Sequence, residues 1–181
     1  MRASVGVKRA MKRKYWILLV VFSWVLVVDQ WTKHAVQQKL ALYQKVEVIR
    51  GLFNLTHVRN TGGAFGILAG EKGGPGSLLF VVVSLIAIGS ILFLFKKMKE
   101  DEESLALSFS LVLGGAIGNL FDRFRYGEVV DFLDFHMASF HWPAFNIADS
   151  AICLGIGLMA YELLIRGHKR KSTRSQPPNS K

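Results

Sequence analysis

"SLLFVVVSLIAIGSILFLF", residues 77–95, decides the fold class. These nineteen residues carry no charge, and a helix needs about 20 such residues to cross the roughly 30 Å hydrocarbon core of a bilayer. A soluble domain of 181 residues could bury a core, but here the apolar residues come in blocks. The stretch therefore predicts a membrane-spanning helix.

Three weaker apolar blocks accompany it. Residues 15–28 are uninterrupted but short, and they span a bilayer only if the helix continues to about residue 36. Residues 105–121 are long enough and contain glycines and serines, which favour close helix packing in membranes. Residues 144–165 form the last block, which contains two polar residues near its start. Together the blocks predict four spanning helices.

The first block has an alternative interpretation as a cleaved signal peptide. Residues 1–28 combine a basic start with an apolar core, as signal peptides do. No small-x-small cleavage site follows, however, and removal would leave three spans. We therefore expect this block to be retained as the first spanning helix.

The basic residues of the chain are distributed unevenly. The formal net charge is +10, and six Lys/Arg lie in residues 1–14, six more in 166–181, and three, Lys96, Lys97 and Lys99, follow the second span. The two longer connections hold only six in total. The positive-inside rule then places both termini in the cytoplasm. The basic tails are expected to meet membrane lipids, and nucleic acid is not expected as a partner.

The expected fold is a mainly α integral membrane protein with a small outer-surface β-sheet and an outer loop. "VEVI" (46–49) and "LFNLTHV" (52–58), separated by a turn, predict the two strands of that sheet. The expected organisation is a basic cytoplasmic tail (1–14), a four-span domain (15–166) and a basic, disordered cytoplasmic tail (167–181).

Polar residues in or beside the four spans gather near one membrane face. Polar groups that converge at membrane depth predict a functional site. The members within or at the start of spans are Asp29, Lys33, Asn119, Asp122, Arg123, Asn146 and Asp149, and those in the outer loops are Asn60 and Asp131.

Several of these residues also have structural explanations. Asp29 and Lys33 are four apart, with the acid N-terminal, as in a helical ion pair. Asp122 is expected to be a charge at the membrane surface, and Asn60 could cap a turn. Cys153, the single cysteine, is expected to pack inside the fourth span.

Two carboxyl groups held close together would supply a specific chemistry. They cannot both ionise, so one keeps its proton while the other accepts a proton from water. Such a pair can activate water against an amide and protonate the leaving amine. Asp149 is one candidate, and the spacing leaves Asp131, Asp134, Asp122 and Glu128 open as its partner.

Other chemistries fit the sequence less well. It has no H-E-x-x-H motif, and His136 and His141 lack a third ligand at helical spacing, so no metal is expected. It also has no G-x-S-x-G motif. A non-enzymatic four-span carrier or lipid-binding scaffold remains the alternative, although a carrier should have polar groups near mid-membrane and on both sides.

Five stretches together resemble the motifs of bacterial lipoprotein signal peptidase, or signal peptidase II. They occur in the order of that family, and the resemblance covers roughly residues 15–166. They are "VDQWTK" (28–33), "NTGGAFG" (60–66), "GGAIGNLFDR" (114–123), "VVDF" (129–132) and "FNIADS" (145–150).

The resemblance implies an aspartyl endopeptidase of the bacterial cytoplasmic (inner) membrane, with its active site at the outer, periplasmic face. Its substrate would be a prolipoprotein that already carries diacylglycerol on a cysteine, cleaved just before that cysteine. The resemblance further implies that no metal or other cofactor takes part, and that the cyclic peptide globomycin blocks the site.

The motif match assigns residues to roles. Asp131 and Asp149 would be the catalytic dyad. As separate hypotheses, we expect Lys33 and Arg123 to balance local acids and the asparagines to bind the substrate backbone. The complete supporting set would be Asp29, Lys33, Asn60, Asn119, Arg123 and Asn146. Gly63 stands where the family often has alanine, a change expected to loosen the backbone.

Overall fold

The computed structural model of the chain describes residues 12–63, 70–137 and 140–174. These residues form four α-helices, and each is long and apolar enough to cross a membrane, as the sequence predicts. The helices are α1 (Arg13–Lys39), α2 (Pro75–Lys97), α3 (Glu103–Tyr126) and α4 (Ile147–Arg174).

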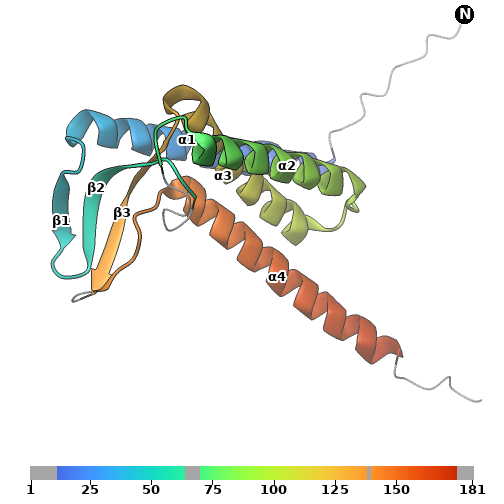
Figure 1. Ribbon diagram of the computed structural model, residues 1–181. Coiled ribbons are helices and arrows are strands. Elements are labelled where there is room, and N and C mark those ends of the chain that lie inside the picture. Colours follow the sequence, from blue (N-terminus) through green and yellow to red (C-terminus); the bar gives the residue numbers. More distant parts are fainter. Residues whose placement is uncertain (1–11, 64–69, 138–139, 175–181) are drawn as a thin grey trace, which may run out of the picture.

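The helices lie together with a small sheet at one end (Figure 1). Helix α3 packs against each of the other three helices. The start of α1, the connection between α2 and α3, and the far end of α4 all lie away from the sheet. The fold therefore has two distinct ends, and the strands of the described residues lie at one of them.

Small residues allow α3 to occupy the centre. A Cβ atom placed on Gly114 would lie 2.9 Å from Cβ of Val25 in α1, and one on Gly118 would lie 2.7 Å from Oδ2 of Asp29. Both distances are too short for a real side chain, so α1 can approach this closely only because glycine is present. The packing role expected for the glycines of the third span is confirmed.

Helix α2 turns most of its surface outward. Ser77 and Phe95 are its buried residues, whereas Leu78 and Ile86 are exposed. An apolar helix with so little buried surface would be unfavourable in water, because each Å² of apolar surface left in water loses about 25 cal/mol of stabilisation. In a bilayer the same surface faces lipid.

The sheet contains the two predicted strands and two that the sequence analysis did not assign. It is antiparallel, in the order β1-β2-β3-β4. Its strands are β1 (Lys45–Ile49), β2 (Phe53–Asn60), β3 (Val129–Met137) and β4 (Phe140–His141). Strand β3 has a weak sequence signal because its acids at 131 and 134 fall on opposite faces, so neither face is purely apolar.

The segment before α4 pairs with β3. The N–H of Phe145 donates to the carbonyl of Leu133 at 3.1 Å, and the N–H of Leu133 donates back at 2.8 Å. This pairing places Asn146 and the start of α4 beside the part of β3 that contains Asp131. Two regions that are separate in sequence thereby meet at the sheet end of the bundle.

The helices extend past the expected domain boundaries at residues 14 and 166. Helix α1 begins at Arg13, and Lys14 is buried, donating to the carbonyl of Met98 at 2.7 Å and pairing with Glu100 at 3.1 Å. Helix α4 continues to Arg174. The rest of both predicted tails, 1–11 and 175–181, lies outside the described residues.

Candidate active site

The first turn of α4 is closed by Asn146 and Asp149. The N–H of Asp149 donates to Oδ1 of Asn146 at 2.9 Å, and the N–H of Asn146 donates to Oδ2 of Asp149 at 3.1 Å. This is the reciprocal arrangement of a capping box, in which the N-cap and N3 side chains each accept a free backbone N–H. The local sequence therefore holds the Asp149 carboxylate at the helix N-terminus.

Asp131 comes from β3 and lies next to this helix start. Its Oδ1 accepts a hydrogen bond from Nδ2 of Asn146 at 2.8 Å, and its Oδ2 accepts one from Nδ2 of Asn60 at 3.1 Å. The Asp131 residue is only 2% exposed. Asparagines from β2 and from the start of α4 therefore hold its carboxyl group on both oxygens.

Asn119 of α3 connects the two acids. Its Nδ2 donates to Oδ1 of Asp149 at 2.7 Å, while its Oδ1 accepts from Asn146 at 3.1 Å and from Nζ of Lys33 at 3.0 Å. One amide thus orients the Asp149 carboxylate, fixes the asparagine that holds Asp131, and ties both to α1.

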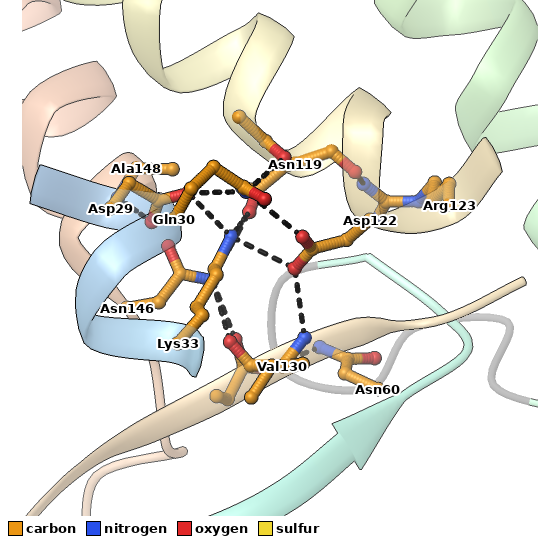
Figure 2. A network of polar contacts seen from close by, with 12 residues as sticks. Asp29, Gln30, Lys33, Asn60, Asn119, Asp122, Arg123, Val130, Asn146 and Ala148 are labelled. Carbon is orange, nitrogen blue, oxygen red and sulfur yellow. Dashed lines mark hydrogen bonds and ion pairs between the residues drawn. The ribbon is translucent and has the colours of Figure 1, made fainter. Parts of the chain in front are cut away.

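Lys33 is the centre of the network that supports the two acids (Figure 2). Its Nζ lies 2.8 Å from Asp29 and 3.0 Å from Asp122, and all three side chains are at most 1% exposed. Asp29 also accepts the N–H of Ala148 at 2.9 Å, at the start of α4. The predicted Asp29–Lys33 ion pair is confirmed, and it belongs to a larger buried cluster.

The interpretation of Asp122 as a membrane-surface charge is wrong. Asp122 is buried and accepts the N–H of Val130 at 3.2 Å and an N–H of Gln30 at 3.0 Å. It therefore links α3 and α1 to the residue that precedes Asp131. Gln30 was not among the predicted site residues. For Asp122 a signal was available, because it follows Asn119 by three residues, a spacing that puts both side chains on one helix face.

Arg123 contacts backbone carbonyls close to the two acids. It donates to the carbonyl of Gly62 at 2.9 Å and to that of Asn119 at 3.3 Å. Its guanidinium also lies over the ring of Phe80, 5.5 Å from the centroid. Arg123 thus joins α3 to the turn that follows β2.

A cavity of about 520 Å³ opens at these groups. Both Asp131 and Asp149 line it, so their carboxyl groups face the same space. The expectation that Cys153 packs inside the bundle is wrong, since it is exposed and also lines the cavity. The remaining lining residues are Asn60, Gly63, Asn119, Arg123, Val129, Trp142, Pro143, Ala144, Phe145, Ser150 and Ile152.

The other acids proposed as partners of Asp149 are engaged elsewhere. Asp134 accepts from Nδ2 of Asn54 across the sheet at 3.1 Å and pairs with Lys45 at 3.1 Å. Glu128 lies 3.7 Å from Arg59. Neither Asp134 nor Glu128 lines the cavity.

The surroundings of Asp131 favour its protonated form. Burial, and after it the nearby charge of Asp149, raise the pKa of Asp131 to about 7. Hydrogen bonds from Asn60 and Asn146, and the charge of Lys33, act in the opposite direction. Near neutral pH the site can therefore hold one proton on Asp131 beside a second carboxyl group, the arrangement needed for acid–base catalysis on water.

Curated relatives match almost the whole chain. A protein named lipoprotein signal peptidase from Geobacter metallireducens is 45% identical over 163 residues, which cover 90% of this chain and 98% of the relative. One of the same name from Syntrophotalea carbinolica is 46% identical over 144 residues, covering 79% and 88%.

Solved structures share the same architecture. One described as a bacterial membrane enzyme has a TM-score of 0.74 and 30% identity, covering 91% of this chain and 94% of that chain. A second has a TM-score of 0.71 and 33% identity. The family model for signal peptidase II matches residues 21–165, a region that includes both carboxyl groups and the whole network around them. The chain therefore belongs to the signal peptidase II family.

Proposed function

We propose that this protein is a membrane aspartyl endopeptidase that removes the signal peptide from diacylglyceryl-modified prolipoproteins, cutting just before the lipid-bearing cysteine. Its relatives carry the name lipoprotein signal peptidase. The observation that supports the mechanism is that Asp131 and Asp149, from different elements, line one cavity and are held by Asn119 and Asn146.

The two carboxyl groups divide the chemistry between them. Asp149 accepts a proton from water, whose oxygen attacks the carbonyl carbon of the scissile amide. Asp131 gives its proton to the carbonyl oxygen, which stabilises the tetrahedral intermediate. When the C–N bond breaks, the leaving nitrogen takes the proton held by Asp149, and a hydroxyl of the intermediate returns a proton to Asp131. The carboxyl product and the free amine then separate, and the dyad is back in its starting state.

The position of the cavity suits a lipid-bearing substrate. The dyad lies at the sheet end of the spanning helices, where the start of α4 is beside β3. The cavity wall also contains Trp142 and Ile152, which are apolar. The acyl chains can stay in the bilayer while the amide reaches water and the dyad.

The proposed location is the cytoplasmic membrane, with the dyad at the outer, periplasmic face. The end of α2 and its connection to α3, which carry Lys96, Lys97 and Lys99, lie away from the sheet, as do the start of α1 and the far end of α4. Basic residues of this kind favour the cytoplasmic side. Membrane lipids and a globomycin-type inhibitor are proposed as further ligands. Cysteines can be introduced into the sheet and labelled with a membrane-impermeant reagent in intact cells. Labelling would report whether the sheet lies at the outer face.

The lipid on the substrate is expected to determine cleavage. A prolipoprotein peptide with diacylglycerol on its cysteine should have kcat/KM about 100-fold higher than the unmodified peptide, because binding of the distant acyl chains positions the amide. Mass spectrometry of the products in neutral-detergent micelles measures the rate and the cleaved bond.

The same peptide with alanine in place of the modified cysteine serves as a control and should be cleaved as poorly as the unmodified form. Equal cleavage of all three peptides would refute the lipid requirement. Cleavage at a bond other than the one before the cysteine would refute the proposed position.

Activity is expected to fall at alkaline pH. Since the pKa of Asp131 is raised to about 7, this group is protonated below that pH and loses its proton above it. The raised value also means that the folded state holds this proton more tightly, so Asp131 favours folding less as pH rises toward 7. Above pH 7, kcat/KM should decrease about tenfold per pH unit.

The substitution Asn60→Ala checks this assignment. It removes a hydrogen bond that lowers the pKa of Asp131, so the alkaline decrease should move to higher pH. A profile that stays flat to pH 9 in the wild type, or moves to lower pH in the variant, would contradict Asp131 as the acid.

A further inference from the structure

The turn after β2 is attached directly to the dyad. Oδ1 of Asn60 accepts the N–H of Gly62 at 2.9 Å, while its Nδ2 donates to the carbonyl of Gly63 at 3.2 Å and to Asp131 at 3.1 Å. The turn-capping role expected for Asn60 is therefore confirmed. Because the same amide holds both the turn and the Asp131 carboxyl, a shift of the turn is transmitted to the dyad.

A side chain of α2 lies behind this turn. A Cβ atom on Gly63 would overlap Cζ and Cε1 of Phe80, so the ring is packed directly against the glycine backbone. The same ring lies beneath the guanidinium of Arg123, which donates to the carbonyl of Gly62. Phe80 thus supports the turn and the arginine together, although it does not itself line the cavity.

These contacts change the interpretation of Gly63. From the sequence, glycine in place of the alanine frequent in the family was expected to loosen the backbone. Instead the missing Cβ is what allows the Phe80 ring to come this close. A guanidinium over an aromatic ring is attracted by the negative face of the ring, so the ring also restricts the position of Arg123.

We propose that Phe80 is a positioning residue for the peptidase reaction, and that Gly63 is required in this chain because the Phe80 ring occupies the space of its Cβ. The inference rests on the proposed function. Through Gly63 and Arg123 the ring sets the position of the cavity wall and, through Asn60, that of the Asp131 carboxyl.

The test is a double-mutant cycle of Gly63→Ala and Phe80→Leu, with kcat, KM and melting temperature measured for each protein. Gly63→Ala should lower kcat about tenfold with KM within about twofold, because a small misplacement of a catalytic group is costly. Leucine lacks the Cε and Cζ atoms of phenylalanine. In the Phe80→Leu background, Gly63→Ala should therefore lower kcat by less than about twofold.

Matched controls come from the connection between β2 and α2 and from α2 itself. Gly70→Ala adds a Cβ that meets nothing within 4 Å, and Phe93→Leu alters an exposed phenylalanine of α2. Both should leave kcat within about twofold of the wild type.

Each result of the cycle has a defined consequence. Full activity of Gly63→Ala, or an equal loss in both backgrounds, would overturn the assignment of Phe80. If the wild type itself fails to cleave the lipid-modified peptide, the proposed function is overturned and the catalytic role of Phe80 with it. In that case a coupling in melting temperature would show only that Gly63 and Phe80 pack together.

Discussion

Replacement of either Asp131 or Asp149 by asparagine is expected to lower kcat for the lipid-modified peptide at least about 1,000-fold. Asparagine keeps the shape of the side chain but can neither take a proton from water nor supply one. At position 131 it also meets two amide donors, from Asn60 and Asn146, with only one acceptor oxygen. Each purified variant is compared with the wild type by peptide cleavage.

The matched control for these variants is Asp134→Asn. Asp134 is also a buried acid of β3, but it pairs with Asn54 and Lys45 away from the cavity. We expect this variant to keep kcat within about fivefold of the wild type. If Asp131→Asn or Asp149→Asn cleaves the peptide at the wild-type rate, that residue is not part of the dyad. If only Asp134→Asn is inactive, the choice between the two acids of β3 is open again.

Lys33→Met is expected to destabilise the fold by about 3–5 kcal/mol, the usual cost of removing one partner from a buried charge cluster. Methionine fills the volume but leaves Asp29 and Asp122 without their cation, although both are at most 1% exposed. The melting temperature in detergent should fall by roughly 10 °C. Cleavage should weaken too, because Asn119 loses a donor that orients it.

Lys12→Met provides the comparison. Lys12 pairs with Glu100 at 2.9 Å, but the two side chains are 62% and 44% exposed, and such surface pairs contribute little to stability because water screens them. Its melting temperature should stay close to that of the wild type. If Lys33→Met melts at the same temperature as Lys12→Met, the Lys33 cluster does not hold α1 and α3 together as inferred.

The four spanning helices could be predicted from the sequence because each depends on local composition. An uncharged run such as residues 77–95 must form its backbone hydrogen bonds internally in lipid, and only a helix satisfies this within one segment. The capping pair Asn146 and Asp149 is also local, since the two residues lie three apart. Strands β1 and β2 were predictable for the same reason.

The pairing of the two acids could not be derived from spacing alone. Asp131 and Asp134 are three apart on one strand, so they point to opposite faces of the sheet. Which face meets α4 depends on the pairing of Phe145 with Leu133, two residues on separate segments of the chain. The motif match selected Asp131, and the structure places that residue, not Asp134, on the cavity.

By itself, then, the sequence determined the number of spans, the segments that form them and the end at which the polar residues gather. Tertiary structure alone decided that Asp122 is buried against Lys33 and that Phe80 fills the space beside Gly63. The physical reason is the range of the interactions. Hydropathy and capping act within a few residues, whereas burial of a charge or packing of a ring depends on distant segments that meet only in the folded chain.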